Sequence, residues 1–392
     1  MEKFKLGILL HAHQPSIQYS DVLEFITNQS YLPLFQTLGE SKKGQITLNV
    51  TGSLLRLWDQ YGYKSIFPMV KDLIDTQKVE IAGTSAFHAL LPKIPRNEAI
   101  RQIHIQEQLL KQYLNLSKPQ GLFLPEMYYS PEIDSVISEL NYQWMIIDES
   151  AIPEAGIKEY GFHRGLKTHQ HIYESSSTPG LFVFFRDRPL SLMVAFDHLL
   201  TIDKFVDRLQ EHFQGNPGYA IIAVDAETFG YHIKGNLNLL ASILNHPQID
   251  VLGVSQLLSM EYSVQKIHEL ISTWGVTQED ITGKRKFPRW CNPANHIHLL
   301  QWELLELATA NSNHLDGLPD DLDQGLNSDQ FWWASGNPCW HPEMVEKGAH
   351  LLLNSILRNS RNDEMVRHRA NELYDKIIAT GRKLYGDKII QC

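Results

Sequence analysis

The sequence predicts an α/β protein in which a parallel β-sheet closes, or nearly closes, into a barrel and a helical bundle follows. Short apolar runs rich in β-branched residues alternate with segments of helical periodicity over the first two thirds of the chain. A repeated strand–helix unit demands parallel strands, and about seven or eight such units suit a barrel better than an open sheet. Beyond residue 262 the strand signals stop and helical patterns continue.

Each element is predicted from its own run of residues. The predicted strands are Lys5–Leu10, Gln45–Val50, Val79–Ala82, Leu122–Leu124, Trp144–Ile147, Leu181–Phe185, Ala220–Val224 and Asp250–Val254. The predicted helices between them are Lys64–Gln77, Arg96–Leu114, Pro131–Leu140, Ile202–Phe213 and Asn236–Asn245. An open doubly wound sheet is the alternative, because one sequence does not give strand order. The chain has no Gly-x-Gly-x-x-Gly or Walker loop that would favour that alternative.

The final third of the chain predicts helices without strands. They are Val264–Ser272, Ala294–Ala310, Ser328–Trp333, Pro342–Leu357 and Asp363–Leu384. We therefore expect a barrel domain over residues 1–262 and a helical domain over residues 263–392 that contributes to the same cleft.

Composition narrows the class of protein. The 392 residues carry a net charge of −10 without an offsetting basic region, which argues against nucleic-acid binding. No apolar run reaches membrane-spanning length, and the N-terminus reads as a first strand rather than a signal peptide. Three scattered cysteines suit free thiols in a reducing compartment better than a disulfide framework, so we expect a cytoplasmic protein.

Carboxylates stand at two predicted strand ends. Asp225 and Glu227 follow a strand that reads as buried on both faces, and Glu126 follows another, with Tyr128 close behind it. Parallel α/β folds place their chemistry at the carboxyl ends of their strands. Two acids with aromatic and histidine neighbours suit the cleavage of a sugar acetal, which needs one ionised and one protonated carboxyl.

The same residues carry a resemblance to a known family. His11-Ala-His13-Gln14-Pro15, Leu124-Pro125-Glu126, Asp225-Ala-Glu227-Thr-Phe229-Gly230 and Ser272-Thr-Trp274-Gly275 with Trp290 stand in the order seen in glycoside hydrolase family 57. The resemblance implies an incomplete (β/α)7 barrel with a C-terminal helical region closing over the site. It also implies retaining chemistry on α-glycosides, of the α-amylase, 4-α-glucanotransferase or branching-enzyme type.

Residue roles follow from the resemblance. Glu126 matches the nucleophile and Asp225 the general acid/base, although Glu227 lies close enough to Asp225 to exchange roles with it. The sugar-contacting residues implied are His11, His13, Gln14, Trp274 and Trp290.

Further candidates come from position alone. Tyr128 is placed to line a sugar subsite, and Arg186, at the end of its own strand, is placed to keep the nucleophile ionised. Read singly, His11 and His13 suit a satisfied core better than a binding site, but the adjacent Gln14-Pro15 at a strand end favours contact with sugar hydroxyls. We expect no metal and no cofactor.

Two other functions compete. A metal-dependent polysaccharide deacetylase needs a metal held by His and Asp; the chain has no His-x-x-x-His pair, although His11, His13 and Asp225 could hold an ion. A non-catalytic carbohydrate-binding or regulatory protein is the second alternative. An α-glucan or oligosaccharide is the expected partner. The linkage, the choice between hydrolysis and transfer, and the oligomeric state stay open.

Overall fold

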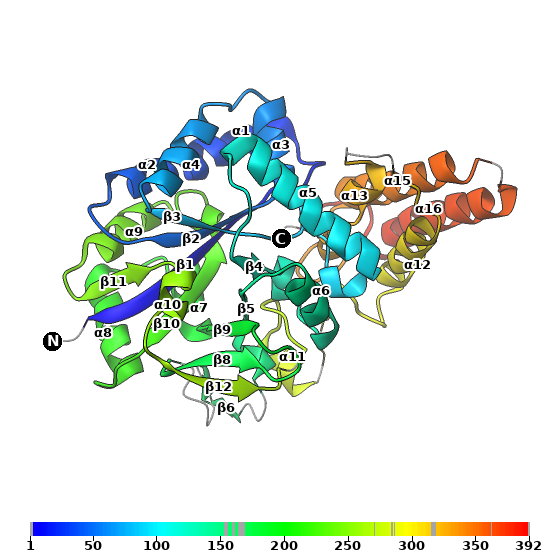
Figure 1. Cartoon of the computed structure of the whole chain (residues 1–392). Coiled ribbons are helices and arrows are strands. Elements are labelled where there is room, and N and C mark those ends of the chain that lie inside the picture. Colours follow the sequence, from blue (N-terminus) through cyan, green and yellow to red (C-terminus); the bar gives the residue numbers. More distant parts are fainter. Residues whose placement is uncertain are drawn as a thin grey trace.

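The computed structural model describes residues 3–152, 156–158, 161–163, 169–269, 271–283, 285, 287–314, 319–361 and 363–390. A barrel forms one side of the molecule and a group of helices extends from it on the other (Figure 1).

Parallel strands close around the barrel. In spatial order they are β1 (Phe4–Ala12), β2 (Ile46–Val50), β3 (Val79–Ala82), β4 (Gly121–Phe123), β5 (Trp144–Asp148), β9 (Phe182–Arg186) and β10 (Tyr219–Asp225), which returns to β1. Two junctions are short: β3 meets β4 through the bridge between Gly83 and Leu122, and β9 meets β10 at the register pair Ile221 and Arg186. The predicted incomplete (β/α)7 barrel is therefore confirmed, and the eight predicted strands appear within two residues of their expected bounds.

Further strands extend the sheet at its rim. β11 (Ile249–Leu252) runs parallel to the start of β1, and β8 (His171–Ser175) is antiparallel to β9. β12 (Ser263–Ile267) is parallel to β8, and β6 (Gly156–Lys158) pairs with β7 (Gly161–His163) as a separate ribbon.

One predicted helix is wrong. The segment Val264–Ser272 begins with strand β12, whose backbone pairs with β8 from Ser263 to Ile267. Four of the five residues in β12 are exposed, so the segment lacks the apolar face that gives either a helix or a strand its period. The sheet thus reaches Ile267, past the point where strand signals stop in the sequence.

Helices surround the barrel. They are α1 (Ser20–Ile26), α2 (Leu32–Glu40), α3 (Gly52–Gln60), α4 (Ile66–Asp75), α5 (Arg96–Leu114), α6 (Asp134–Glu139), α7 (Arg188–Phe196), α8 (Ile202–Phe213), α9 (Asn236–Asn245) and α10 (Val254–Leu258). The predictions for α5, α8 and α9 match at both ends. The patterns of α1, α2, α3 and α7 did not predict helices.

The C-terminal region is helical. It contains α11 (Gln278–Thr282), α12 (His296–Ala310), α13 (Asp321–Gly325), α14 (Asp329–Trp333), α15 (Pro342–Asn359) and α16 (Glu364–Tyr385). Helices α12, α15 and α16 pack on one another and project away from the barrel (Figure 1). The predicted helical region is confirmed for these elements.

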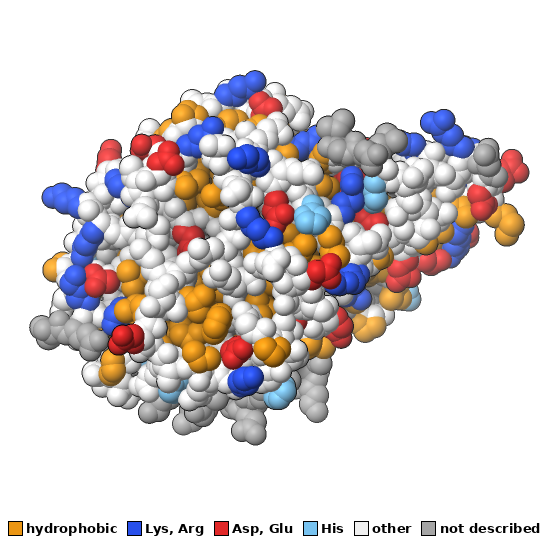
Figure 2. Space-filling model, viewed as in Figure 1, with side chains coloured by type: hydrophobic (Ala, Val, Ile, Leu, Met, Phe, Trp, Pro, Cys, Tyr) orange, Lys and Arg blue, Asp and Glu red, His pale blue; other side chains and the backbone are white. Residues whose placement is uncertain are grey.

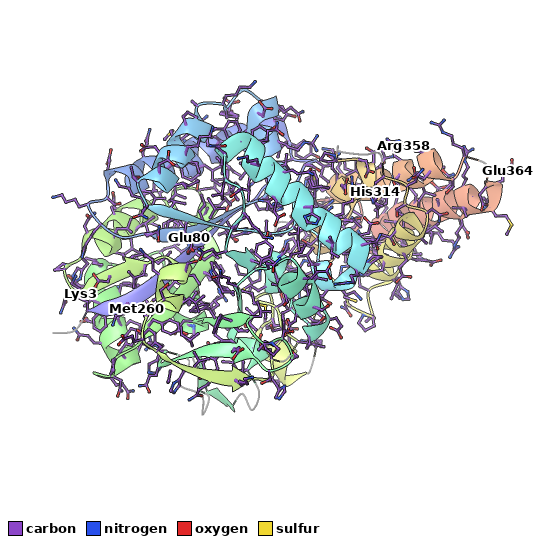
Figure 3. All side chains as sticks on the ribbon, viewed as in Figure 1. Lys3, Glu80, Met260, His314, Arg358 and Glu364 are labelled. Carbon is purple, nitrogen blue, oxygen red and sulfur yellow. The ribbon has the colours of Figure 1, made fainter. Side chains whose placement is uncertain are left out.

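Charged side chains fasten this region to α5. Arg101 donates two hydrogen bonds to Asp323, of 2.8 and 2.7 Å, and His314 lies 2.9 Å from Glu98 on one side and 2.9 Å from Asp320 on the other. Figure 3 shows His314 on the helical side of the molecule. The two carboxylates raise the pKa of His314 to about 9, so the imidazolium joins barrel and helices as an ion pair.

Apolar side chains gather in three clusters. The first lies between β1, β2, β10 and their helices and includes Leu10 and Val224. The second runs from β4 and β5 into the C-terminal helices and includes Leu124 and Trp302. The third, which includes Phe123 and Ala223, fills the barrel between them.

Two further features bear on the sequence expectations. Cys339 is disulfide-bonded, contrary to the expectation that all cysteines are free thiols, whereas Cys291 is free.

Across the part of the chain that the structure describes, no helix combines the length and apolarity needed to cross a membrane. Figure 2 shows acidic and basic side chains interspersed over one face of the molecule.

Candidate active site

The candidate residues converge at the carboxyl ends of the barrel strands. His11, near the end of β1, stands in register with Asp225 of β10 on one side and with Asn49 of β2 on the other. Glu126 lies in the turn directly after β4. Parallel strands bring their ends to one rim, and this is why residues more than two hundred positions apart meet.

Glu126 is held in an unusual backbone conformation. Its φ and ψ are 59° and 14°, in the left-handed region that non-glycine residues seldom adopt. The indole Nε1 of Trp274 donates a 2.8 Å hydrogen bond to Oε2 of Glu126, and Thr273 donates one of 2.6 Å to the Glu126 backbone oxygen. The segment Thr273–Trp274 thus fixes both the main chain and the carboxyl of Glu126, as expected where strain serves a site.

Asp225 and Glu227 differ in how their carboxyls are engaged. Oε1 of Glu227 accepts hydrogen bonds from the hydroxyl of Tyr31 and, at 3.1 Å, from Nε2 of Gln14. The carboxyl of Asp225 accepts no hydrogen bond from the residues that the structure describes. Glu227 is therefore anchored, whereas Asp225 is free to reach a ligand.

Burial raises the pKa of all three carboxyls. The pKa of Glu126 rises to about 8, that of Glu227 to about 8 and that of Asp225 to about 6. The indole N–H of Trp274 partly offsets the rise at Glu126, and the positive charge of Arg186 partly offsets it at Asp225. The negative charges of Asp329 and Asp225 add to the rise at Glu126, whose pKa of about 8 means that this carboxyl holds a proton at neutral pH.

Histidines form the floor of the site. His11 contacts Asn49 through Nδ1 at 2.7 Å and His88 through Nε2 at 3.1 Å, so both of its ring nitrogens are occupied. The ring of His13 stacks on that of His88 with centroids 3.9 Å apart. Burial lowers the pKa of His11 and of His13 to about 3 and that of His88 well below its usual value, so all three rings are neutral.

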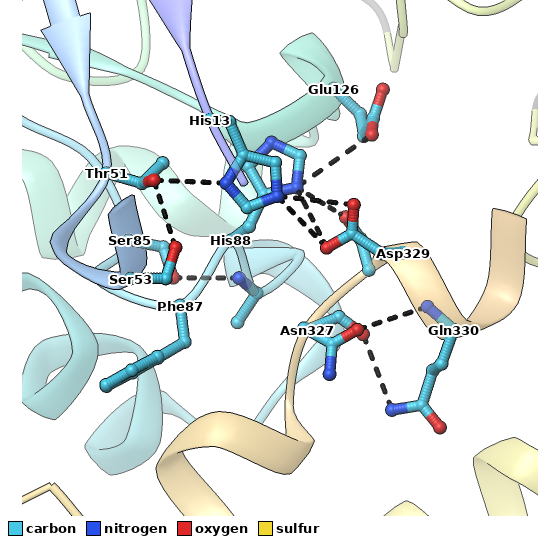
Figure 4. Close-up of polar contacts among 12 residues, drawn as sticks. His13, Thr51, Ser53, Ser85, Phe87, His88, Glu126, Asn327, Asp329 and Gln330 are labelled. Carbon is cyan, nitrogen blue, oxygen red and sulfur yellow. Dashed lines mark hydrogen bonds and ion pairs between the residues drawn. The ribbon is translucent and has the colours of Figure 1, made fainter. Parts of the chain in front are cut away.

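Asp329 reaches this floor from the C-terminal helices. Its carboxylate oxygens lie 3.1 and 3.2 Å from Nε2 of His13, and Oδ2 lies 3.8 Å from Nδ1 of His88 (Figure 4). The same nitrogen of His88 lies 4.0 Å from Oε1 of Glu126. Helix α14 therefore contributes a carboxyl to the barrel's site.

Arg186 lies beside the other acid. It donates to the backbone oxygen of Ala223 at 2.9 Å and to Asp148 at 3.2 Å, and its guanidinium stands 5.6 Å from the Trp274 ring centroid. Its charge acts on Asp225, so the structure places it with that acid, whereas the sequence argument paired it with Glu126. Arg188 shares Asp148 and donates to the Trp274 backbone oxygen at 3.0 Å.

Two predicted sugar-contacting aromatics lie in the core instead. Trp290 is fully buried, accepts the indole N–H of Trp302 on its backbone oxygen and presses its ring against Gly275. Tyr128 is also buried and stacks on Phe287 with centroids 3.8 Å apart. Trp290 packs beside Gly275, the neighbour of Trp274, and Tyr128 lies two residues after Glu126. Both rings therefore support the segments that carry Trp274 and Glu126.

His88 and Asp329 were not predicted from the sequence. His88 follows β3, so the strand-end rule that found Glu126 and Asp225 could have found it. Asp329 had no comparable signal, since it stands at the start of a short helix 316 residues from His13.

Comparison with known proteins shows the family of this chain. The sequence model of the family described as "Glycosyl hydrolase family 57" matches residues 8–269, about two thirds of the chain, including Glu126 and Asp225. The chain belongs to glycosyl hydrolase family 57. It is 23% identical over 222 residues to an α-amylase of Pyrococcus furiosus and 25% identical over 232 residues to a 4-α-glucanotransferase of Thermococcus kodakarensis. These matches cover 56% and 59% of this chain, but only 32% and 33% of the relatives, so the chain spans about a third of their length.

Two solved structures, one of them described as a family 57 enzyme, share the fold. A branching enzyme from Thermococcus kodakaraensis superimposes with a TM-score of 0.73 at 15% identity, covering 98% of this chain and 96% of that one. A 4-α-glucanotransferase from Thermococcus litoralis gives a TM-score of 0.70 at 17% identity, covering 91% of this chain and 60% of that one. The family 57 barrel and its helical region are therefore both present here.

Proposed function

We propose that this protein is a retaining glycosidase or transglycosylase acting on α-linked glucans or oligosaccharides, with Glu126 as nucleophile and Asp225 as general acid/base. Family membership supports the reaction class, and the curated relatives with longer chains are α-amylases and a 4-α-glucanotransferase. In this proposal the barrel, residues 1–262, and the helical region, residues 263–392, form one site.

One contrast between the acids carries the assignment. Glu126 is fixed by the indole of Trp274, as a nucleophile must be to meet the anomeric carbon in line. Asp225 has no hydrogen-bond partner among the described side chains and is free to protonate a leaving oxygen, whereas Glu227 is tied to Tyr31 and Gln14. Glu227 thus serves as a sugar-contacting or positioning group in this proposal.

In the protein without substrate, the pKa values of Glu126 and Asp225 are in the opposite order to the one that the reaction needs. The pKa of Glu126, about 8, lies above that of Asp225, about 6, although the nucleophile must be ionised and the acid protonated. A bound sugar reverses the order: positive charge developing at the anomeric carbon favours the Glu126 carboxylate, and loss of water raises the pKa of Asp225.

The double displacement then follows. Glu126 attacks the anomeric carbon while Asp225 gives its proton to the leaving oxygen, and a covalent glycosyl–enzyme forms. Asp225, now a carboxylate, takes a proton from water or from a sugar hydroxyl, which attacks the same carbon and frees Glu126. Water gives hydrolysis and a sugar gives transfer.

Product analysis on maltooligosaccharides of defined length tests the proposal. Transfer gives products longer than the substrate, whereas hydrolysis gives only shorter ones. The Glu126→Gln protein, prepared in the same way, is the control for contaminating activity. Release of products of inverted anomeric configuration by the wild type, or no turnover of any α-glucan by a folded protein, would contradict the proposal.

A further inference from the structure

The hydrogen-bond network at the floor of the site fixes the ring protons of the histidines. Ser53 donates to the backbone oxygen of Gln14 at 2.8 Å, so its oxygen accepts from Thr51 at 3.0 Å. Thr51 has then given its only proton, and it accepts from Nδ1 of His13 at 3.0 Å. In the neutral ring, Nε2 of His13 therefore carries a lone pair.

The ring proton of His88 is fixed by its neighbours in a similar way. Asn49 donates through Nδ2 to the backbone oxygens of Ala82 and Gly83, so its Oδ1 accepts from Nδ1 of His11. Nε2 of His11 is then an acceptor, and Nε2 of His88 donates to it. Nδ1 of His88 is left with a lone pair and accepts from Ser328 at 2.9 Å.

Electron pairs consequently face one another across a small gap. Nε2 of His13 meets both oxygens of Asp329, and Nδ1 of His88 points to the same side (Figure 4). The ligand atoms of His13, His88 and Asp329 all lie within 4.8 Å of one another. Acceptors that converge in this way attract a positive centre, either a proton or a metal ion, between them.

We propose that His13, His88 and Asp329 form a binding site for a divalent transition-metal ion such as Zn²⁺, and that the bound ion inhibits the enzyme by drawing Glu126 into its coordination shell. Two neutral imidazoles and a carboxylate are a ligand set that suits Zn²⁺. Thr51 fixes the free nitrogen of His13, in the way that outer partners orient metal-binding histidines. Oε1 of Glu126, 4.0 Å from Nδ1 of His88, supplies the fourth ligand.

Binding needs a small local adjustment. The rings of His13 and His88 are stacked with their planes 18° apart, and an ion must lie close to both planes. Nδ1 of His88 also accepts from Ser328, so on binding the Ser328 hydroxyl must turn away and one ring must rotate about its side-chain torsions toward Asp329.

A second cluster provides an internal control. Glu98, His314 and Asp323 also place their ligand atoms within 4.8 Å of one another. However, Arg101 already occupies Asp323, and His314 is an imidazolium whose two N–H groups face Glu98 and Asp320. No lone pair is available on that ring, so we expect this cluster not to bind a metal ion.

Calorimetric titration of the EDTA-treated full chain with Zn²⁺ tests the site, and Co²⁺ absorption reports its geometry. We expect one tight site in the wild type and in His314→Gln. Asp329→Ala should weaken it by at least about 100-fold, and Thr51→Val by about 10-fold, the range for outer partners of metal ligands. Circular dichroism establishes that each variant is folded.

Several outcomes would overturn the metal site. They are equal affinity in the wild type and Asp329→Ala, loss of binding in His314→Gln alone, or no binding of Zn²⁺ tighter than about 1 mM by the folded wild type. These measurements need no glycoside, so the site stands or falls apart from the proposed function. The inhibitory step does rest on that function: turnover should fall as the site fills and return with EDTA, and unchanged turnover at full occupancy would refute inhibition.

Discussion

The indole N–H of Trp274 donates a 2.8 Å hydrogen bond to Oε2 of Glu126, and the backbone N–H of Trp274 donates one of 3.2 Å to the Glu126 oxygen. Trp274, which follows the last strand of the sheet, thus holds both the carboxyl and the main chain of the proposed nucleophile. The contact explains how a segment outside the barrel can govern its chemistry.

Trp274→Phe keeps the ring but removes the donor, so we expect kcat to fall by about 10-fold to 100-fold, the usual value of a hydrogen bond to a charged group. The lost donor also raises the pKa of Glu126, so the acid limb of the pH–rate profile should move to higher pH. Trp274→Ala should in addition lower the ratio of transfer to hydrolysis by admitting water. Unchanged pH profiles in both variants would show that the hydrogen bond does not act in catalysis.

Removal of the nucleophile gives a second prediction. Glu126→Gln should lower turnover by at least about 10³-fold without loss of the fold. Glu126→Gly suits the left-handed backbone at this position and leaves room for an external nucleophile. With an activated aryl α-glycoside, azide should restore turnover in Glu126→Gly and give a β-glycosyl azide, identified by NMR. An α-configured azide, or wild-type activity in Glu126→Gln, would remove Glu126 from the role.

The acid/base assignment is tested through leaving groups. Asp225→Asn should slow substrates with poor leaving groups by about 10²-fold to 10⁴-fold, and substrates with good leaving groups far less, since only the former need a proton. Glu227→Gln is the matched control and should affect both classes alike. If Glu227→Gln instead shows the dependence on the leaving group, the two acids exchange roles.

The pKa of Glu227 makes a prediction about stability. Burial raises this pKa from 4.5 in the unfolded chain to about 8, so the folded state holds a proton that the unfolded state releases between these values. The stability that this proton provides is complete below pH 4.5 and is lost as pH rises through 8. Glu227→Gln keeps the acceptor for Tyr31 and Gln14 but does not ionise. It should therefore raise the free energy of unfolding relative to wild type by about 1 kcal/mol or more at pH 9, and little at pH 4.5. Urea titrations at both pH values measure the difference, and an equal effect at both would contradict the assignment of the shift.

The barrel was predictable because its strands are buried on both faces. Runs such as Tyr219–Asp225 are apolar throughout, and their length separates them from helices. Strand β12 was not, since only Ile267 of its residues is buried and its partner β8 decides its conformation. A rim strand of this kind takes its structure from its neighbour, which the local sequence does not reveal.

The residues of the candidate site were likewise predictable only in part. Residues at strand ends, such as Glu126 and Asp225, were found because the barrel fixes where strand ends meet. Asp329 was missed, and the full burial of Trp290 was not foreseen, because both depend on how the C-terminal helices pack on the barrel. A tryptophan in a loop reads alike whether it faces a ligand or a core, and only packing distinguishes the two.

The division of the apolar core has a consequence for how this protein can change. Asp225 is flanked by residues of the first cluster, Val224 and Ala226, and Glu126 follows Leu124 of the second. Between them lies the third cluster, to which both Phe123, before Leu124, and Ala223, before Val224, belong, so packing in this cluster bears on the distance between the two carboxyls. A substitution inside the barrel that changes the volume of one side chain should change the distance between the nucleophile and the acid without replacing either. Substitutions at these interior positions can therefore change the product or the acceptor while both catalytic carboxyls are kept. Directed evolution should sample these positions as well as those that line the cleft.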